Sequence, residues 1–257
     1  MPFTLAHPAI IVPLLYKGRR WLSATGLILG SMSPDFEYFL RLRPGGGFGH
    51  STVGIFTLDL PLALVLTGLF HGLVKRPLVR SLPVFLRRRF GRFAAQHWPL
   101  RNLWSPRLLL AIIIGAGSHL VWDGVTHTRG RIAHELPFLV DTVHNRPVFV
   151  WLQYGSSLVG LLIILWFVWQ LPVTRRPPRV STRQQAIFWL ITAVLFSVFV
   201  LLFVRYIQHR YPVGYGYLTA TAVSSISASI LAVVLTSTFV RLLRNDWPAE
   251  QPTSTPT

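Results

Sequence analysis

Five long apolar segments constrain what this chain can fold into. They lie at roughly residues 53–74, 108–126, 155–171, 185–204 and 217–240. A helix of about 20 apolar residues crosses the hydrocarbon core of a bilayer, and in lipid only helices and closed barrels satisfy their own backbone hydrogen bonds. Only 13% of the 257 residues are charged, roughly half the share in soluble domains. The sequence therefore predicts an all-α fold, a polytopic helical bundle in the membrane.

The N-terminal region predicts a shorter element, a helical hairpin. Its first arm, residues 3–16, is interrupted by Pro8 and Pro13, and its second arm leads to Asp35. Each arm is too short to cross the bilayer alone, so we expect the hairpin to be partly re-entrant or sheltered by other helices. It would bring His7 and Asp35 together at its open end and raise the total to five to seven membrane helices. Because no basic n-region or cleavage site is present, these residues are expected to stay in the mature protein.

The chain is expected to have three parts. Residues 1–171 form a membrane domain that carries the polar motifs, residues 172–244 add two helices, and residues 245–257 form a disordered tail rich in Pro, Ser and Thr.

Basic residues outnumber acidic ones by 25 to 8, which gives a net charge of +17. They lie between the apolar segments, so a membrane protein is indicated and nucleic acid is not an expected partner. Residues 75–107 hold nine basic residues and no acid; they either lie on an anionic leaflet or only fix the topology. If they are cytoplasmic, 18 of the 25 basic residues share that side. This distribution predicts a cytoplasmic C-terminus, with the polar motifs at the opposite face of the membrane.

Three polar residues recur at one-turn spacing at the end of the second apolar segment. His119, Asp123 and His127 each follow the previous one by four residues, so on a helix they point the same way within roughly 80°. Imidazole and carboxylate groups so arranged can hold zinc or a similar ion. The alternative is a structural polar stripe that packs between helices. An aspartate and two histidines in such an apolar segment are costly without a partner, which makes the stripe a candidate site.

Further candidate ligands are expected to reach the same face. They are His7, Asp35 and His50, while Asp59 lies within an apolar segment and needs a partner, for which the same ion is one candidate. Each has a structural alternative: His7 as an interfacial histidine, Asp35 as a cap of the hairpin, and His50 as part of a glycine-rich loop. Because the chain has no cysteine, any metal must be held by His, Asp or Glu.

Several motifs in this order resemble the bacterial DUF4184 membrane proteins. The resemblance is carried by MPFTLAHP, GSMSPDFEYF, GHS, the DLP at 59–61, GSHLVWDGVTH and LQYGSS, and it runs to about residue 165. More distantly, the arrangement is similar to YdjM-like inner-membrane proteins described as metal-dependent hydrolases. Their pattern pairs an early His, a Pro-Asp and an HS element with a later His-x-x-x-Asp. Carried over, the ligand set that this resemblance implies is His7, Asp35, His50, His119 and Asp123.

The resemblance implies a protein of the bacterial inner membrane and, with the clustered His and Asp residues, favours a metal-dependent hydrolase that acts on phosphoesters of lipid or envelope substrates. A divalent ion, with zinc expected, would activate water. Asp35 and His127 are the candidate catalytic residues, and Arg129, Arg131 and Ser51 are the candidate substrate contacts.

Two other classes of protein fit the same residues. A metal-ion or proton-linked transporter would use the cluster as a relay, and a structural membrane protein would use it to hold helices together. The polar residues gather at one end of the apolar segments instead of continuing across them, which favours the hydrolase.

Overall fold

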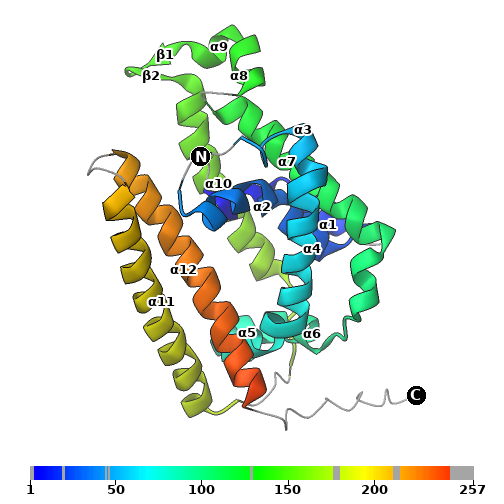
Figure 1. The fold of residues 1–257 in the computed structure, drawn as a ribbon. Helices are drawn as coiled ribbons and strands as arrows, with labels where there is room; N and C mark the ends of the chain where they lie inside the picture. The colour runs from blue at the N-terminus through cyan, green and yellow to red at the C-terminus, as the bar shows by residue number, and fades with distance from the viewer. Residues whose placement is uncertain are drawn as a thin grey trace. The chain divides into compact units, whose positions relative to one another are not determined.

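The fold is all-α, with helices joined by short loops and one small hairpin, in a computed structural model (Figure 1). The structure describes residues 3–18, 21–43, 45, 47–127, 130–175, 180–210 and 215–243, with the side chains of Arg131 and Tyr215 left aside. The expected disordered tail, residues 245–257, lies outside the described residues.

The five expected membrane helices are confirmed. The helices long and apolar enough to cross a membrane are Thr52–Ser81, α7 (Pro106–Thr126), α10 (Val148–Gln170), α11 (Thr182–Arg210) and, within α12 (Tyr215–Leu242), Gly216–Leu242. The first is a composite of α3 (Thr52–Gly54), η2 (Ile55–Asp59), α4 (Leu60–Leu69), η3 (Phe70–Val74) and α5 (Lys75–Ser81). Both η2 and η3 are π-helical turns, an arrangement found often at functional sites.

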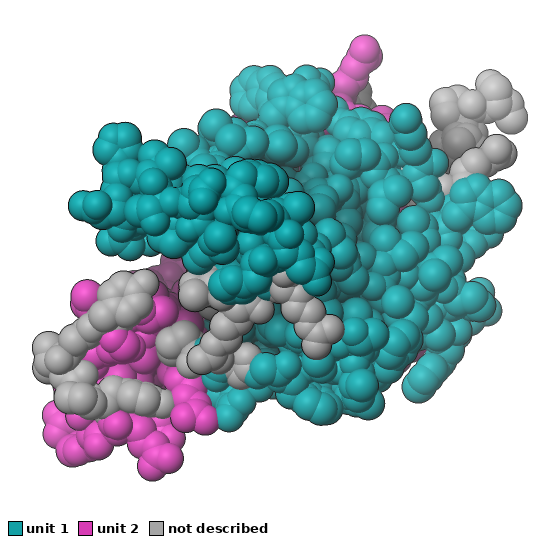
Figure 2. All heavy atoms as spheres, turned by 90° about the horizontal axis from the view of Figure 1, so that it is seen from above, with its two compact units in different colours: residues 1–41, 45–67, 101–170 teal, residues 42–44, 68–100, 171–257 magenta. Residues whose placement is uncertain are grey.

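The chain divides into two compact units, coloured separately in Figure 2. The first comprises residues 1–41, 45–67 and 101–170, and the second comprises residues 42–44, 68–100 and 171–257. All the candidate ligands belong to the first unit.

Two helices form the centre of the first unit, α2 (Ala24–Arg41) and α7, and they cross at glycines (Figure 1). A Cβ atom built at Gly115 would lie 2.5 Å from the Leu27 carbonyl oxygen, and one at Gly26 would lie 2.9 Å from the Ala111 Cβ. Gly30 meets the backbone of Ile112 in the same way. Small residues let the two backbones touch, as is common between membrane helices.

The N-terminal residues form the short arm that the two prolines predict. They are η1 (Thr4–Ala9), a 3-10 helix, and α1 (Val12–Lys17). The arm is held on α10, where a Cβ at Gly160 would lie 2.9 Å from the Ala6 carbonyl oxygen and the Phe3 N–H donates to Ser157 Oγ at 3.0 Å. This docking fixes the position of His7.

The second arm, α2, passes through Pro34 and ends at Arg41. A proline inside a helix leaves the carbonyl four residues earlier without its N–H partner. Here that carbonyl, of Gly30, accepts the Ser33 hydroxyl at 2.8 Å. Asp35 therefore lies inside a continuous helix and is fully buried, which rules out the alternative that it caps or ends the hairpin.

A short region of the first unit joins α7 to α10. It contains α8 (Arg131–Glu135), α9 (Pro137–Val140) and the antiparallel strands β1 (Thr142–Val143) and β2 (Arg146–Pro147).

In the second unit α11 and α12 lie side by side (Figure 1). The basic region forms α5, α6 (Val84–Ala95) and η4 (Leu100–Trp104), the last continuing into the first unit. It is partly folded inward, since the buried Lys75 donates through Nζ to the Gln96 carbonyl at 2.8 Å. Its binding to an anionic leaflet, or its role in fixing the topology, stays a prediction.

Candidate metal centre

Five candidate ligands converge in the first unit, from four separate segments. His7 comes from η1, Asp35 from α2, His50 from the loop before α3, and His119 and Asp123 from α7. The ligand atoms of His7, His119 and Asp123 lie within 4.8 Å of one another, and so do those of Asp35, His50 and His119. His119 belongs to both groups, so the five residues form one cluster.

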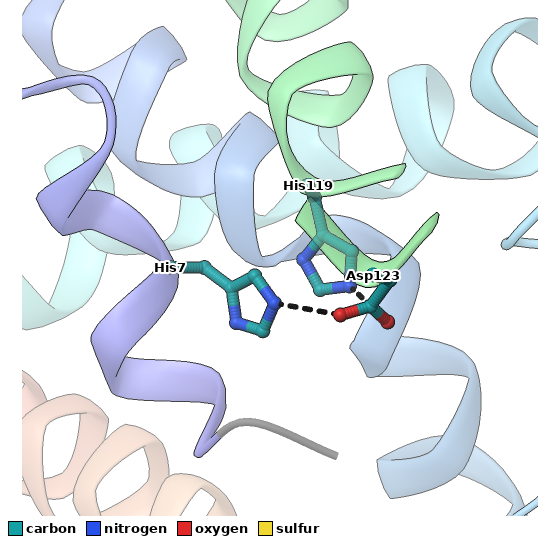
Figure 3. Close-up of side chains that lie close together, drawn as sticks. All are labelled: His7, His119 and Asp123. Carbon is teal, nitrogen blue, oxygen red and sulfur yellow. Dashed lines mark hydrogen bonds and ion pairs between the residues drawn. The ribbon is translucent and has the colours of Figure 1, made fainter. Parts of the chain in front are cut away.

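Asp123 is the most connected member of the cluster. Its Oδ1 lies 3.1 Å from His7 Nε2, and its Oδ2 lies 3.3 Å from His50 Nε2 and 3.4 Å from His119 Nε2. Figure 3 shows His7 from η1 and the two α7 residues pointing toward one another. The rings of His7 and His119 stack, with centroids 3.8 Å apart. The spacing of four residues between His119 and Asp123 places both on one helix face, as the sequence predicts.

Asp35 lies near the same two histidines, His50 and His119. Its Oδ1 lies 3.5 Å from His50 Nε2 and 3.7 Å from His119 Nε2, beyond hydrogen-bond distance or at its limit. Its Oδ2 accepts a hydrogen bond of 2.6 Å from the Thr4 hydroxyl. One carboxylate oxygen is thus fixed by the protein, while the other is buried without a hydrogen-bond partner among the described residues.

The orientation of His119 leaves a lone pair facing the carboxylates. Its Nδ1 lies 2.8 Å from the Ser31 carbonyl oxygen. A carbonyl only accepts, so Nδ1 carries the proton and Nε2 of the neutral ring is a free donor atom for a metal. A backbone carbonyl that orients a histidine in this way is typical of metal sites.

These observations test whether the residues fit a cation, and they do. Three imidazoles and two carboxylates are the donor types that zinc and similar divalent ions take in proteins. His119 Nε2 and Asp35 Oδ1 are buried without a hydrogen-bond partner, and buried polar atoms are normally paired. All the ion pairs found for these two aspartates in the described part of the chain are with histidines, so a bound cation would supply the missing positive charge.

His50 lies at the partly open side of the cluster. Its side chain is 17% exposed, stacks on Tyr38 and lies 3.2 Å from the Tyr38 hydroxyl through Nδ1. Burial alone would lower the pKa of His50, but the neighbouring carboxylates of Asp123 and Asp35 outweigh it and raise the pKa to about 9. Ser51 caps the next helix, accepting from the Gly54 N–H at 2.9 Å and donating to the Phe48 carbonyl at 2.6 Å. It thereby holds the turn that carries His50.

His127 borders the cluster just past the end of α7. Its Nδ1 lies 3.2 Å from the Asp123 carbonyl oxygen and 3.3 Å from Asp123 Oδ1. Both are acceptors, so Nδ1 carries the proton and Nε2 keeps its lone pair. Burial lowers the pKa of His127, although the Asp123 charge acts in the opposite direction. The ring is 23% exposed. A partly exposed histidine with a lowered pKa therefore lies beside the five candidate ligands.

Comparison with known proteins places the chain in a family. Residues 1–240 match the sequence model of DUF4184, described as a domain of unknown function. The chain belongs to the DUF4184 family. The match continues through α11 and nearly all of α12, beyond residue 165 where the recognised motifs end. No curated protein and no solved structure matches the chain.

The five candidate ligands of this DUF4184 protein therefore lie in one cluster. Two of the expected substrate contacts, by contrast, have no described side chain. Arg129 lies outside the described residues, and Arg131 begins α8 with its side chain undescribed. A role for either residue, or for Ser51, in substrate binding stays a prediction.

Three contributors to this DUF4184 site were missed by sequence reasoning. Thr4 bonds Asp35, the Ser31 carbonyl orients His119, and Tyr38 packs on His50. Thr4 and Tyr38 lie three residues from His7 and Asp35 in the sequence, but neither spacing indicates the partner that each side chain contacts.

Proposed function

We propose that this DUF4184 protein is a metal-dependent hydrolase of phosphoesters in lipid or envelope substrates, with its site at the extracytoplasmic face. The observation that carries the proposal is the convergence of three imidazoles and two carboxylates, with His119 Nε2 and Asp35 Oδ1 buried and unpaired among the described residues. His7, Asp35, His50, His119 and Asp123 would hold a divalent ion, with zinc expected from the imidazole-rich set. When bound, such an ion lowers the pKa of its water toward ~7 and polarises a phosphoryl oxygen.

The side chains of the cluster differ in exposure, which supports access by a substrate from one side. The side chains of His7, His119 and Asp35 are fully buried, whereas those of Asp123, His50 and His127 are 10%, 17% and 23% exposed. A phosphoester would therefore arrive on the side of His50 and His127. The expected basic contacts, Arg129 and Arg131, follow His127 closely in the sequence, where they can pair with phosphate.

His127 is suited to proton transfer in such a reaction. Its Nδ1 proton is held by the carbonyl and carboxylate of Asp123, so the ring is oriented. Its Nε2 is buried without a hydrogen-bond partner among the described residues, and it would be the atom that takes a proton from an attacking water. Asp35 has one oxygen fixed by Thr4, and it would serve as a ligand or as the alternative base.

The test is hydrolysis by purified protein in lipid, across a panel of phosphoester lipids and lipid-linked diphosphates. We expect cleavage of at least one substrate that chelator abolishes, and loss of that activity in His119→Ala with helical content unchanged. Proteoliposomes should show no uptake of zinc, manganese or protons that depends on Asp123. Ion flux lost in Asp123→Asn, with no hydrolysis across the panel, would favour the transporter instead.

A further inference from the structure

Asp59 is a buried carboxylate that the five-ligand cluster does not use. Its side chain is fully buried, and neither of its oxygens has a hydrogen-bond partner within the described part of the chain. It lies in the π-helical turn η2, a kind of distortion that often presents a functional side chain. Such a buried, unpaired carboxylate is costly, so Asp59 calls for a partner.

Its surroundings are rich in oxygen atoms. A Cβ atom built at Gly49, the residue before His50, would lie 3.0 Å from the Pro34 carbonyl oxygen, 3.2 Å from Asp59 Oδ1 and 3.3 Å from Glu37 Oε2. Two carboxylates and a carbonyl therefore face the backbone of Gly49, and a Cβ atom there would have to displace them by a few tenths of an ångström. The charges of His50, His119, Glu37 and Asp35 also act on Asp59.

The charges near Asp59 are unbalanced. Glu37 is paired with Arg41 at 2.6 Å and accepts the Gly49 N–H at 2.9 Å. One divalent ion bound by Asp35 and Asp123 would neutralise those two carboxylates. No positive charge of that ion would remain to balance Asp59. Asp59 belongs to neither group of atoms that lie close enough to share an ion, so the ion held by the five ligands does not satisfy it.

We propose a second cation site, anchored by Asp59 and completed by the Pro34 carbonyl oxygen and Glu37 Oε2, which face Gly49 beside Asp59 Oδ1. Because its donors are carboxylates and a carbonyl, the site suits a hard ion such as Mg²⁺ or Mn²⁺, whereas the histidine cluster suits zinc. The inference deepens the proposed function, since two-metal centres are widespread in phosphoester hydrolysis.

Metal stoichiometry tests this site independently of catalysis. Stripped protein in lipid nanodiscs is loaded with zinc, measured by elemental analysis, and then titrated with Mn²⁺ followed by electron paramagnetic resonance. We expect about two metals per wild-type chain, as in other two-metal centres, one of them manganese. Asp59→Asn should keep zinc and lose manganese, while Asp141→Asn, which removes an exposed carboxylate of the same unit, should keep both.

Manganese binding by Asp59→Asn equal to that of wild type, or no manganese binding by the zinc-loaded wild type, would overturn the site. If Asp59→Asn also loses zinc, Asp59→Glu decides: zinc retained with manganese supports the site, and any other result counts against it. A protein that binds both ions yet hydrolyses nothing would sink the hydrolase and leave the second site standing.

Discussion

Substitution of Gly115 by alanine should weaken metal binding although residue 115 is not a ligand. The new Cβ would lie 2.5 Å from the Leu27 carbonyl oxygen and 2.6 Å from the Ser31 nitrogen. An ordinary carbon–oxygen contact is at least about 3.4 Å, so α2 and α7 must separate by roughly 1 Å at this crossing. That shift would stretch the hydrogen bond from His119 Nδ1 to the Ser31 carbonyl from its present 2.8 Å to roughly 3.7 Å, beyond hydrogen-bond distance.

The expected result is a loss in zinc affinity of roughly 10–100-fold, the usual effect of removing a group that orients a metal-binding histidine. Overpacking should also cost about 1–3 kcal/mol of stability. Zinc competition with a chromophoric chelator measures the affinity in detergent, and circular dichroism measures the stability. Gly117→Ala is the matched control, because the space around Gly117 in the same helix is open. Wild-type affinity in Gly115→Ala, or an equal loss in Gly117→Ala, would refute the reasoning.

Three further predictions concern the metal and the topology. A metal must displace the proton from His50, whose pKa is raised to about 9. Zinc affinity measured calorimetrically should therefore increase with pH up to about pH 9, by about tenfold per pH unit for each proton released. A flat profile from pH 6 to 9 would exclude His50 as a ligand. Asp123→Ala should lose most of its bound metal in elemental analysis while keeping its helical content, and full retention would contradict the site. Reporter fusions after residues 90 and 178 should report the cytoplasm and one near residue 140 the other side; a cytoplasmic signal at residue 140 would contradict the extracytoplasmic site.

Much of the fold and of the ligand set is readable from the sequence because both rest on local rules. Five apolar segments predict five membrane helices, and these are confirmed. The spacing of His119 and Asp123 predicts a shared helix face. Alternation of the spans predicts that His7, Asp35 and His50 lie at the same face of the membrane as that end of the helix. The structure brings these five residues together.

The remainder depends on contacts that no local pattern encodes. Pro34 suggests the end of a helix, yet α2 continues because the Ser33 hydroxyl satisfies the Gly30 carbonyl. The partner of His119 is the backbone of Ser31, and backbone acceptors leave no trace in residue type. Asp59 reads from the sequence as a residue in need of a partner, but its separation from the histidine cluster depends on how η2 packs.

The contact between His7 and Asp123 spans 116 residues, and it therefore sets an order of assembly. At a synthesis rate of about 5–20 residues per second, the N-terminal arm exists for roughly 6–23 s before its partner on α7 has been made. During that interval His7 and the carboxylate of Asp35 have no counterpart from α7. We expect α2, which carries Asp35, to stay at the membrane surface or in the insertion machinery during that interval, because a stranded aspartate is unfavourable in lipid. The first residues of the chain can take their final place only after α7 has been made.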